Sequence, residues 1–474
     1  MQRTQTDGRP TGLLVAFAAV VLAMLPAVLD QTMLATGLPV IAGDLGTLSD
    51  VSWIVTAYVV AAAAATPLWG KLGDRLGRKR MLELALVAFV TASALCGAAQ
   101  DITQLIVLRL VQGAAAGGLM ALAMAAVGDL VTPRERGRYQ GYIAATFAVA
   151  TIVGPLLGGA LVQGPGWRWV FFVNLPIGAV ALAGLRLRLP AVAAHRPEHP
   201  LDVAGAVLLA GATSTLMLAC IQDAQRPLLA AATVALAAAL VVQERRAGDP
   251  IVPLHLLRNR TVALVSVALF FATAALFAVT VFVPLFLQAT TGATPTEAGL
   301  LLVPAMLGIT ASTTVAGRSI ARTGRYKRFP VAGLALMCAA LVALAAVSSA
   351  PSRLWTGVAL AGFGLGFGMV TQVLVTAIQN TVARRELGVA TATAGFFRAL
   401  GGAVGAAVLG AVFAAQAGSA DGAGAVRADV IDGVQAVFAV AAPLAALGLL
   451  AVLALVEAPL TPARPVRERQ GATS

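Results

Sequence analysis

The chain has 474 residues, of which 59% are hydrophobic and only 11% are charged. A soluble globular protein carries about 25% charged residues, and the mean hydropathy of this chain is +0.87. The composition therefore excludes an ordinary soluble enzyme and indicates a membrane protein with many spans. The net charge of +12 would suit a nucleic-acid-binding protein, but the positions of the basic residues indicate membrane topology instead.

Long apolar runs follow one another along the whole sequence, and the joints between them are too short for a separate soluble domain. A spanning helix needs roughly 20 mainly apolar residues. We therefore expect an all-α polytopic membrane protein with 14 transmembrane helices. These lie at about 12–37, 51–70, 81–99, 103–127, 139–163, 167–187, 201–221, 226–244, 260–287, 295–316, 330–348, 352–380, 388–416 and 431–456.

The Lys and Arg residues support this count because they alternate loop by loop. With a cytoplasmic N-terminus, 27 of them fall in inner segments and four in outer loops, as the positive-inside rule requires. We therefore expect a multi-pass protein with both termini in the cytoplasm, and no nucleic-acid partner. Only Arg109 and Arg398 lie deep within spans.

A short basic loop occurs twice, 247 residues apart. "GKLGDRLGRKR" at 70–80 and "GRSIARTGRYK" at 317–327 each follow the second helix of a group of six. This predicts two six-helix pseudo-repeat bundles, at 12–187 and 260–456, with two inserted linker helices at 201–244. Duplicated halves are typical of alternating-access transporters; the alternative is two unrelated Arg-rich loops. The aligned pairs are Gly70 and Gly317, Arg75 and Arg322, Gly77 and Gly324, and Arg78 and Arg325.

Several motifs, taken with their order and helix placement, resemble those of the major facilitator superfamily. The loop at 70–80, "LIVLRLVQG" at 105–113 and "GPLLGG" at 154–159 resemble its loop, fourth-helix and antiporter motifs. "LDQTMLATGLP" at 29–39, "LDVAGAVLL" at 201–209 and "FFRALGG" at 396–402 resemble its fourteen-helix drug:proton antiporter branch. The resemblance implies proton-coupled export of small lipophilic molecules, such as drugs or antibiotics, across the inner membrane of a bacterium.

The first basic loop contains glycines and an acid that a plain positive-inside loop does not require. Asp74 can pair with a local cation or accept hydrogen bonds from a helix N-terminus. We hypothesise a cytoplasmic charge latch of Asp74, Arg78 and Asp129, closed when the transporter faces outward. Ala321 aligns with Asp74 in the second half, so a latch there needs another construction. The residues assigned to this gate are Gly70, Gly73, Asp74, Arg75, Gly77, Arg78 and Asp129.

The span at 139–163 carries a stretch of small residues interrupted by a proline. Small residues let membrane helices pack closely, and proline bends a helix. We expect an antiporter hinge between the halves, with ordinary small-residue packing as the alternative. The stretch comprises Gly154, Pro155, Gly158 and Gly159.

Asp30 is the only acid well inside a span, and Arg109 lies at nearly the same depth. A charge there costs roughly 2.5–3.5 kcal/mol on insertion scales, which makes it a functional candidate. Burial favours the neutral acid and a nearby cation favours the carboxylate, so Asp30 is the candidate proton site. The alternatives are a static ion pair for Asp30 and a structural strut to backbone carbonyls for Arg109.

The substrate cavity is expected to include Gln31, Gln112, Phe277 and Arg398. Arg398 would contact substrate or neutralise the carbonyl ends of a broken helix, and the sequence leaves both open. With one acid and two cations in the spans, we expect neutral, weakly basic or anionic lipophilic substrates.

The sequence predicts no enzyme activity, no cofactor and no metal site. Cys96, Cys220 and Cys338 fall in separate apolar runs, and prolines disrupt the helix that would align His195 with His199. We expect a monomer whose partners are the lipid bilayer, protons and a small lipophilic substrate. The alternatives are a proton-coupled uptake symporter and a non-transporting receptor or scaffold.

Overall fold

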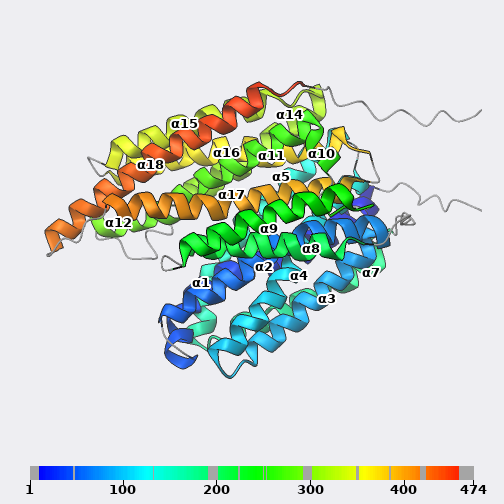
Figure 1. Cartoon of the computed structure of the whole chain (residues 1–474), viewed down its shortest axis with the longest axis horizontal. Helices are drawn as coiled ribbons and strands as arrows, with labels where there is room; N and C mark the ends of the chain where they lie inside the picture. The colour runs from blue at the N-terminus through cyan, green and yellow to red at the C-terminus, as the bar shows by residue number, and fades with distance from the viewer. Residues whose placement is uncertain are drawn as a thin grey trace, which may run out of the picture.

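In the computed structural model, the described part of the chain is built of helices that run side by side (Figure 1). The described residues are 10–45, 48–131, 133–190, 201–221, 225–248, 250–251, 254–291, 302–348, 352–383, 386–416 and 423–457.

Helices occupy all the positions at which spans are expected. The first group is α1 (Pro10–Leu45), α2 (Leu48–Leu76), α3 (Arg78–Gly97), α4 (Ile102–Leu130), α5 (Pro133–Gln163), α6 (Trp169–Phe172) and α7 (Asn174–Arg188). The next pair is α8 (Val203–Ile221) and α9 (Arg226–Arg246). The last group is α10 (Leu254–Arg258), α11 (Arg260–Phe277), η1 (Ala278–Phe282), α12 (Val283–Thr291), α14 (Val303–Thr323), α15 (Arg328–Ser348), α16 (Arg353–Thr381), α17 (Leu387–Gln416) and α18 (Ala423–Leu453).

Within the described residues, eleven helices are long and apolar enough to cross a membrane. The chain is therefore a multi-pass membrane protein, but the count of fourteen stays a prediction. The other three positions hold α5, α8 and α14. Two expected spans are also interrupted: Val173 separates α6 from α7, and the five-residue π-helix η1 follows α11.

The helix contacts repeat between the two groups. In the first group α4 packs on α2 and α3, and α1 packs on α5 and α7; in the last group α16 packs on α14 and α15, and α11 packs on α17 and α18. Contacts between the groups follow the same symmetry, since α2 meets α17 and α5 meets α14. Helices α8 and α9 pack on each other, and α8 touches α2 and α17; Figure 1 shows the pair between the blue-cyan and yellow-red groups. This pattern supports the proposed division at 12–187, 201–244 and 260–456.

Equivalent glycines make the closest contacts in each group. A Cβ at Gly113 of α4 would overlap the backbone of Tyr58 in α2, and a Cβ at Gly364 of α16 would overlap the backbone of Ala305 in α14. Small residues of this kind let membrane helices approach to backbone distance. The basic loops match as well, because Gly77 and Gly324 are two of the three glycines with positive φ in the described chain, at 94° and 68°.

We predict that Gly364→Ala lowers the melting temperature of the purified protein, because backbone atoms cannot give way to the new methyl group. Overpacking of this kind costs about 1–3 kcal/mol. Gly357 is the matched control on the same helix, with nothing within 4 Å of an added Cβ. Gly357→Ala should leave stability unchanged or raise it, since alanine is the better helix former. Equal melting temperatures for both variants would contradict the proposed contact.

Candidate functional site

The first group of helices encloses a buried ion pair. Arg109 on α4 donates from Nη1 to Oδ2 of Asp30 on α1. Asp30 is 0% exposed and Arg109 is 1% exposed, so neither charge reaches water or lipid. Buried charges are tolerated when they are paired and hydrogen-bonded. The two side chains therefore meet at one depth, as their positions in the sequence predicted.

Two amides complete the coordination of the Asp30 carboxylate. Gln112 donates from Nε2 to Oδ1 at 2.9 Å, and Asn174 at the start of α7 donates to the same oxygen at 3.4 Å. Asn174 also donates to Oγ of Ser93 on α3 at 3.0 Å, and Ser93 in turn donates to the Phe171 carbonyl at 2.9 Å. Asp30 is thus the centre of a network that joins α1, α3, α4 and α7.

Arg109 has further partners besides the acid. Its Nη1 donates to Oε1 of Gln112 at 2.8 Å, and its Nε donates to the Ile54 carbonyl at 3.4 Å. The Tyr58 ring lies over the guanidinium, with its centroid 4.1 Å from Cζ. A cation over an aromatic face is stabilised by the ring quadrupole. Arg109 would therefore keep polar partners if Asp30 became neutral.

Tyr58 separates this network from a central cavity. Its hydroxyl donates to the Ala27 carbonyl at 3.2 Å, and both residues line the cavity wall. Asp30 and Arg109 do not line it. The ion pair and the cavity are therefore neighbouring but separate compartments, with the Tyr58 side chain between them.

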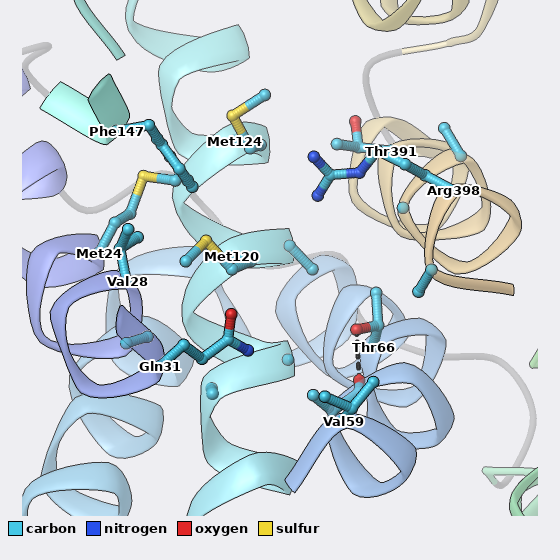
Figure 2. A pocket seen from close by; sticks show the side chains of 18 of the residues that line it. Met24, Val28, Gln31, Val59, Thr66, Met120, Met124, Phe147, Thr391 and Arg398 are labelled. Carbon is cyan, nitrogen blue, oxygen red and sulfur yellow. Dashed lines mark hydrogen bonds between the residues drawn. The ribbon is translucent and has the colours of Figure 1, made fainter. Parts of the chain in front are cut away.

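The cavity lies between the two groups of helices and has a volume of about 400 Å³. Its walls come from α1, α2, α4, α5, α16 and α17. Figure 2 shows Gln31 pointing in from α1, and Arg398 pointing from α17 toward the side that carries Met124 and Phe147. A second cavity of about 350 Å³ adjoins it, lined from α5, α11, η1, α14, α16 and α17. The two share Phe147, Thr371, Gln372, Arg398 and Ala399.

Two of the expected cavity residues lie elsewhere. Gln112 is buried in the Asp30 network, because it follows Arg109 by one helical turn on the same face of α4. Phe277 lines neither cavity, whereas Leu276 and Thr280, four residues apart, line the second one. Residues at i and i+4 share a helix face, and their neighbours point away from it. Helix α17, which carries Arg398, is itself continuous from Leu387 to Gln416.

The predicted latch residues meet at the end of the bundle that carries the basic loops. Arg78 donates from Nη2 to Oδ1 of Asp74 at 2.7 Å, and from Nη1 to Asp129 at the end of α4. Asp74 also accepts from the backbone N–H groups of Gly388 at 3.0 Å and Val389 at 2.8 Å. Gly388 and Val389 belong to the first turn of α17, where the helix dipole favours a carboxylate. The acid of one group thus holds a helix N-terminus of the other.

A glycine permits this approach. A Cβ at Gly70 would lie 2.8 Å from the Gly388 carbonyl oxygen, so α2 and α17 could not come this close with a larger residue. Gly73 packs in the same way on the Leu122 side chain of α4, and Arg75 lies half-buried at the end of α2. The gate residues are therefore gathered where the two groups touch.

In the described part of the second half this arrangement does not recur, and Ala321 stands where Asp74 would align. There Glu457, beyond α18, accepts from the backbone N–H groups of Tyr326 at 2.6 Å and Lys327 at 2.9 Å. This contact joins the segment after α18 to the loop between α14 and α15, both in the second group of helices. A separate link between groups comes from Gln379 on α16, which donates to the Met124 carbonyl at 3.3 Å.

Among the four residues predicted to form a hinge between the halves, Gly154 makes a close contact. A Cβ at Gly154 would overlap Thr32 of α1, so this glycine packs within the first group. Gly159 has nothing within 4 Å of an added Cβ, so it makes no close contact; Gly158 is buried. The approach of α5 to α14 occurs instead at Gly141, against Thr314. Side-chain contacts of Pro155 lie outside the described ones.

No group of three or more His, Cys, Asp or Glu side chains that could hold a metal ion occurs in the described chain. His195 and His199 lie outside the described residues.

The family model described as Major Facilitator Superfamily matches residues 20–406. The chain belongs to the major facilitator superfamily. Members named among its relatives are transporters, and a transporter of this superfamily acts on a small-molecule substrate within the lipid bilayer.

Two relatives and one solved structure show the range of this superfamily. The chain is 32% identical over 422 residues to multidrug transporter protein MdtP of Bacillus subtilis (strain 168), covering 87% of this chain and 77% of that one. It is 37% identical over 408 residues to an MFS-type transporter of Mycobacterium tuberculosis (strain ATCC 25618 / H37Rv), covering 84% of this chain but spanning only 59% of that relative's length. The crystal structure of the human organic anion transporter MFSD10 superposes with a TM-score of 0.69 at 18% identity, covering 94% of this chain and 100% of that one.

Sequence reasoning missed three residues that complete the site: Tyr58, Ser93 and Asn174. Each is a single polar residue in an apolar run, which could equally face a neighbouring helix or a lipid headgroup. Asn174 offered one signal, since an amide within a predicted span needs a partner there. Its position at the break between α6 and α7 could not be read from composition.

We predict that Asp74→Asn slows transport by roughly tenfold, which corresponds to about 1.4 kcal/mol. The amide would place a donor where the N–H groups of Gly388 and Val389 converge, and it would lose the charge that pairs with Arg78. Glu83→Gln is the matched control, because Glu83 pairs at 4.0 Å with Arg186 inside one group. Transport and membrane insertion are compared in intact cells; equal transport by both variants would remove the latch.

Proposed function

We propose that this protein is a proton-coupled antiporter that exports small lipophilic molecules from the cytoplasm by alternating access, with Asp30 as its proton site. The observation that carries the proposal is a fully buried carboxylate beside, but sealed from, the cavity between two similar groups of helices. The name of the Bacillus subtilis relative, a multidrug transporter, supports the substrate class. We place it in a bacterial inner membrane with both termini in the cytoplasm.

The network around Asp30 suits reversible protonation. As a carboxylate, Asp30 accepts from Arg109, Gln112 and Asn174. As a neutral acid it would keep its amide donors, while Arg109 would keep Gln112, the Ile54 carbonyl and the Tyr58 ring. Both forms therefore have partners, which a purely static ion pair would not require. This is the arrangement expected of a group that gains and loses a proton during a cycle.

Helix α1 offers a physical route from the proton to the substrate. Asp30 is followed directly by Gln31, which lines the cavity, and by Thr32, against which Gly154 of α5 packs. Helix α5 in turn packs on α14 of the other group. A change in the Asp30–Arg109 bond that shifts α1 would therefore act on the cavity wall and on the interface between groups.

The charge latch accounts for one state of the cycle. Asp74, Arg78 and Asp129 hold the basic end of the bundle closed against α17. With that end in the cytoplasm, this is the outward-facing or occluded state, and transport requires the latch to open. Antiport needs proton and substrate to favour opposite states.

One assay separates this proposal from its alternatives. Inverted membrane vesicles receive an imposed pH gradient and a panel of lipophilic compounds. Substrate-dependent release of protons supports antiport, and coupling of opposite sign supports an uptake symporter. Absence of flux under all conditions supports a receptor or scaffold.

We predict that Asp30→Asn abolishes proton-coupled export, with a loss of at least roughly tenfold, as expected when a coupling of about 1–3 kcal/mol disappears. The amide cannot bind and release a proton, yet it fits the same donors. Asp44→Asn is the matched control, because Asp44 lies at the exposed end of the same helix. Normal proton release by the Asp30 variant in inverted vesicles would exclude Asp30 as the proton site.

We also predict that Tyr58→Ala lets protons leak without substrate, because it removes the ring between the cavity and the ion pair. Tyr58→Phe keeps the ring, so its proteoliposomes should hold an imposed pH gradient as long as those with the wild type. The measurement is the decay of an imposed pH gradient in proteoliposomes without substrate. Equal decay for the alanine and phenylalanine variants would mean that the ring is not the barrier.

A further inference from the structure

We propose that Arg398 binds the acidic head of an anionic, lipophilic substrate, so that the exported molecules include sulfonates or carboxylates with an apolar body. The inference rests on the proposed export function and names the charge class of its substrate. It is carried by the position of Arg398 at the junction of the two cavities.

Arg398 is the only charged side chain that lines either described cavity. Its guanidinium has no hydrogen-bond or ion-pair partner among the described residues. Charged groups within a span are otherwise held by partners or water-filled cavities, and the other arginine inside a span, Arg109, has five partners. Arg398 therefore presents free donors to whatever enters the cavity.

The acid of the site cannot neutralise this cation. Asp30 is fully buried on the far side of Tyr58, and its charge is already matched by Arg109. The ion pair is neutral as a unit, so the cavity carries the charge of Arg398 alone. A cationic molecule would meet an unscreened like charge, whereas an anionic head would gain a charge-assisted, bidentate contact.

Polar groups beside Arg398 can complete the binding of an acidic head. Gln372 lines both cavities, and its Oε1 is buried without a hydrogen-bond partner in the described structure. The amide can therefore turn so that its NH₂ group faces an anion. Thr371 lies next to it and lines the same junction; its hydroxyl donates to the Phe367 carbonyl at 3.5 Å and would have to turn from that carbonyl to donate to an anion.

The wall across from Arg398 suits an apolar body. Figure 2 shows Met24, Met120, Met124 and Phe147 on the side that the guanidinium faces. Methionine side chains adapt to ligands of differing shape. The two cavities, of about 400 and 350 Å³, are of the size that drug-like ligands occupy. The ligand that fits both features has its charge at one end and an aromatic body at the other.

The test uses two probes that share one aromatic framework and differ by a single acidic group. These are 8-anilinonaphthalene-1-sulfonate, an anion, and N-phenyl-1-naphthylamine, which is neutral. Equilibrium dialysis measures their binding to the purified full-length chain in nanodiscs, for the wild type and for Arg398→Gln, Arg398→Lys and Arg188→Gln. Arg188 is exposed at the end of α7 and serves as the charge-matched control.

We expect Arg398→Gln to weaken binding of the sulfonate about tenfold or more, the loss of a hydrogen bond to a charged group. Binding of the neutral probe should stay within about threefold, which also shows that the variant is folded. Arg398→Lys should retain part of the sulfonate binding, and Arg188→Gln should match the wild type.

Three results would overturn the inference: unchanged sulfonate binding in Arg398→Gln, no preference of the wild type for the sulfonate over the neutral probe, or equal losses for both probes in a folded Arg398→Lys protein. Because binding is measured without a pH gradient, it does not depend on antiport. A protein that binds the sulfonate through Arg398 but exchanges no protons would refute the proposed function and leave this inference standing.

Discussion

The first half of the molecule is organised around the cost of burying one carboxylate in an apolar bundle. An isolated charge within a membrane is expensive, and breaking a buried pair by removing one partner costs about 3–5 kcal/mol. Asp30 is therefore held by Arg109 and by two amides, which come from two helices other than its own. These bonds fix the rotation of α1, α4 and α7 about their axes. The same rotations place Gln31 in the cavity and Gln112 out of it.

The two halves share their packing but not their chemistry. Gly113 and Gly364 make equivalent backbone contacts, one on Tyr58 and the other on Ala305. The second half thus has a methyl group where the first has the ring that covers Arg109. Phe277 aligns with Asp30 in that half, so no acid is equivalent to it, and the ion of that half, Arg398, faces the cavity without a partner among the described residues. A common backbone therefore supports a buried ion pair on one side and an open cation on the other.

The sequence could predict features that depend on composition and depth. Apolar runs predicted the helices, basic loops predicted the repeat, and shared depth predicted that Asp30 and Arg109 would meet. Side-chain direction was harder, because a helix in an apolar environment shows no polar face from which to read its rotation. For that reason Gln112 was assigned to the cavity and Tyr58 was overlooked. Phe277 was assigned to the cavity for the same reason, because aligning the two repeats does not show which way a side chain faces.

The separation of the proposed proton site at Asp30 from the cavity limits how a proton and a substrate could be coupled. A proton on Asp30 would leave the charge of Arg109 unmatched, and this would attract an anion at Arg398 rather than repel it. Electrostatics alone would therefore favour binding of both together, which is symport. Antiport requires a conformational step that outweighs this attraction. Helix α1 is the element placed to provide it, because one turn of α1 carries the proposed proton site, a cavity wall at Gln31 and, at Thr32, the contact with Gly154 of α5.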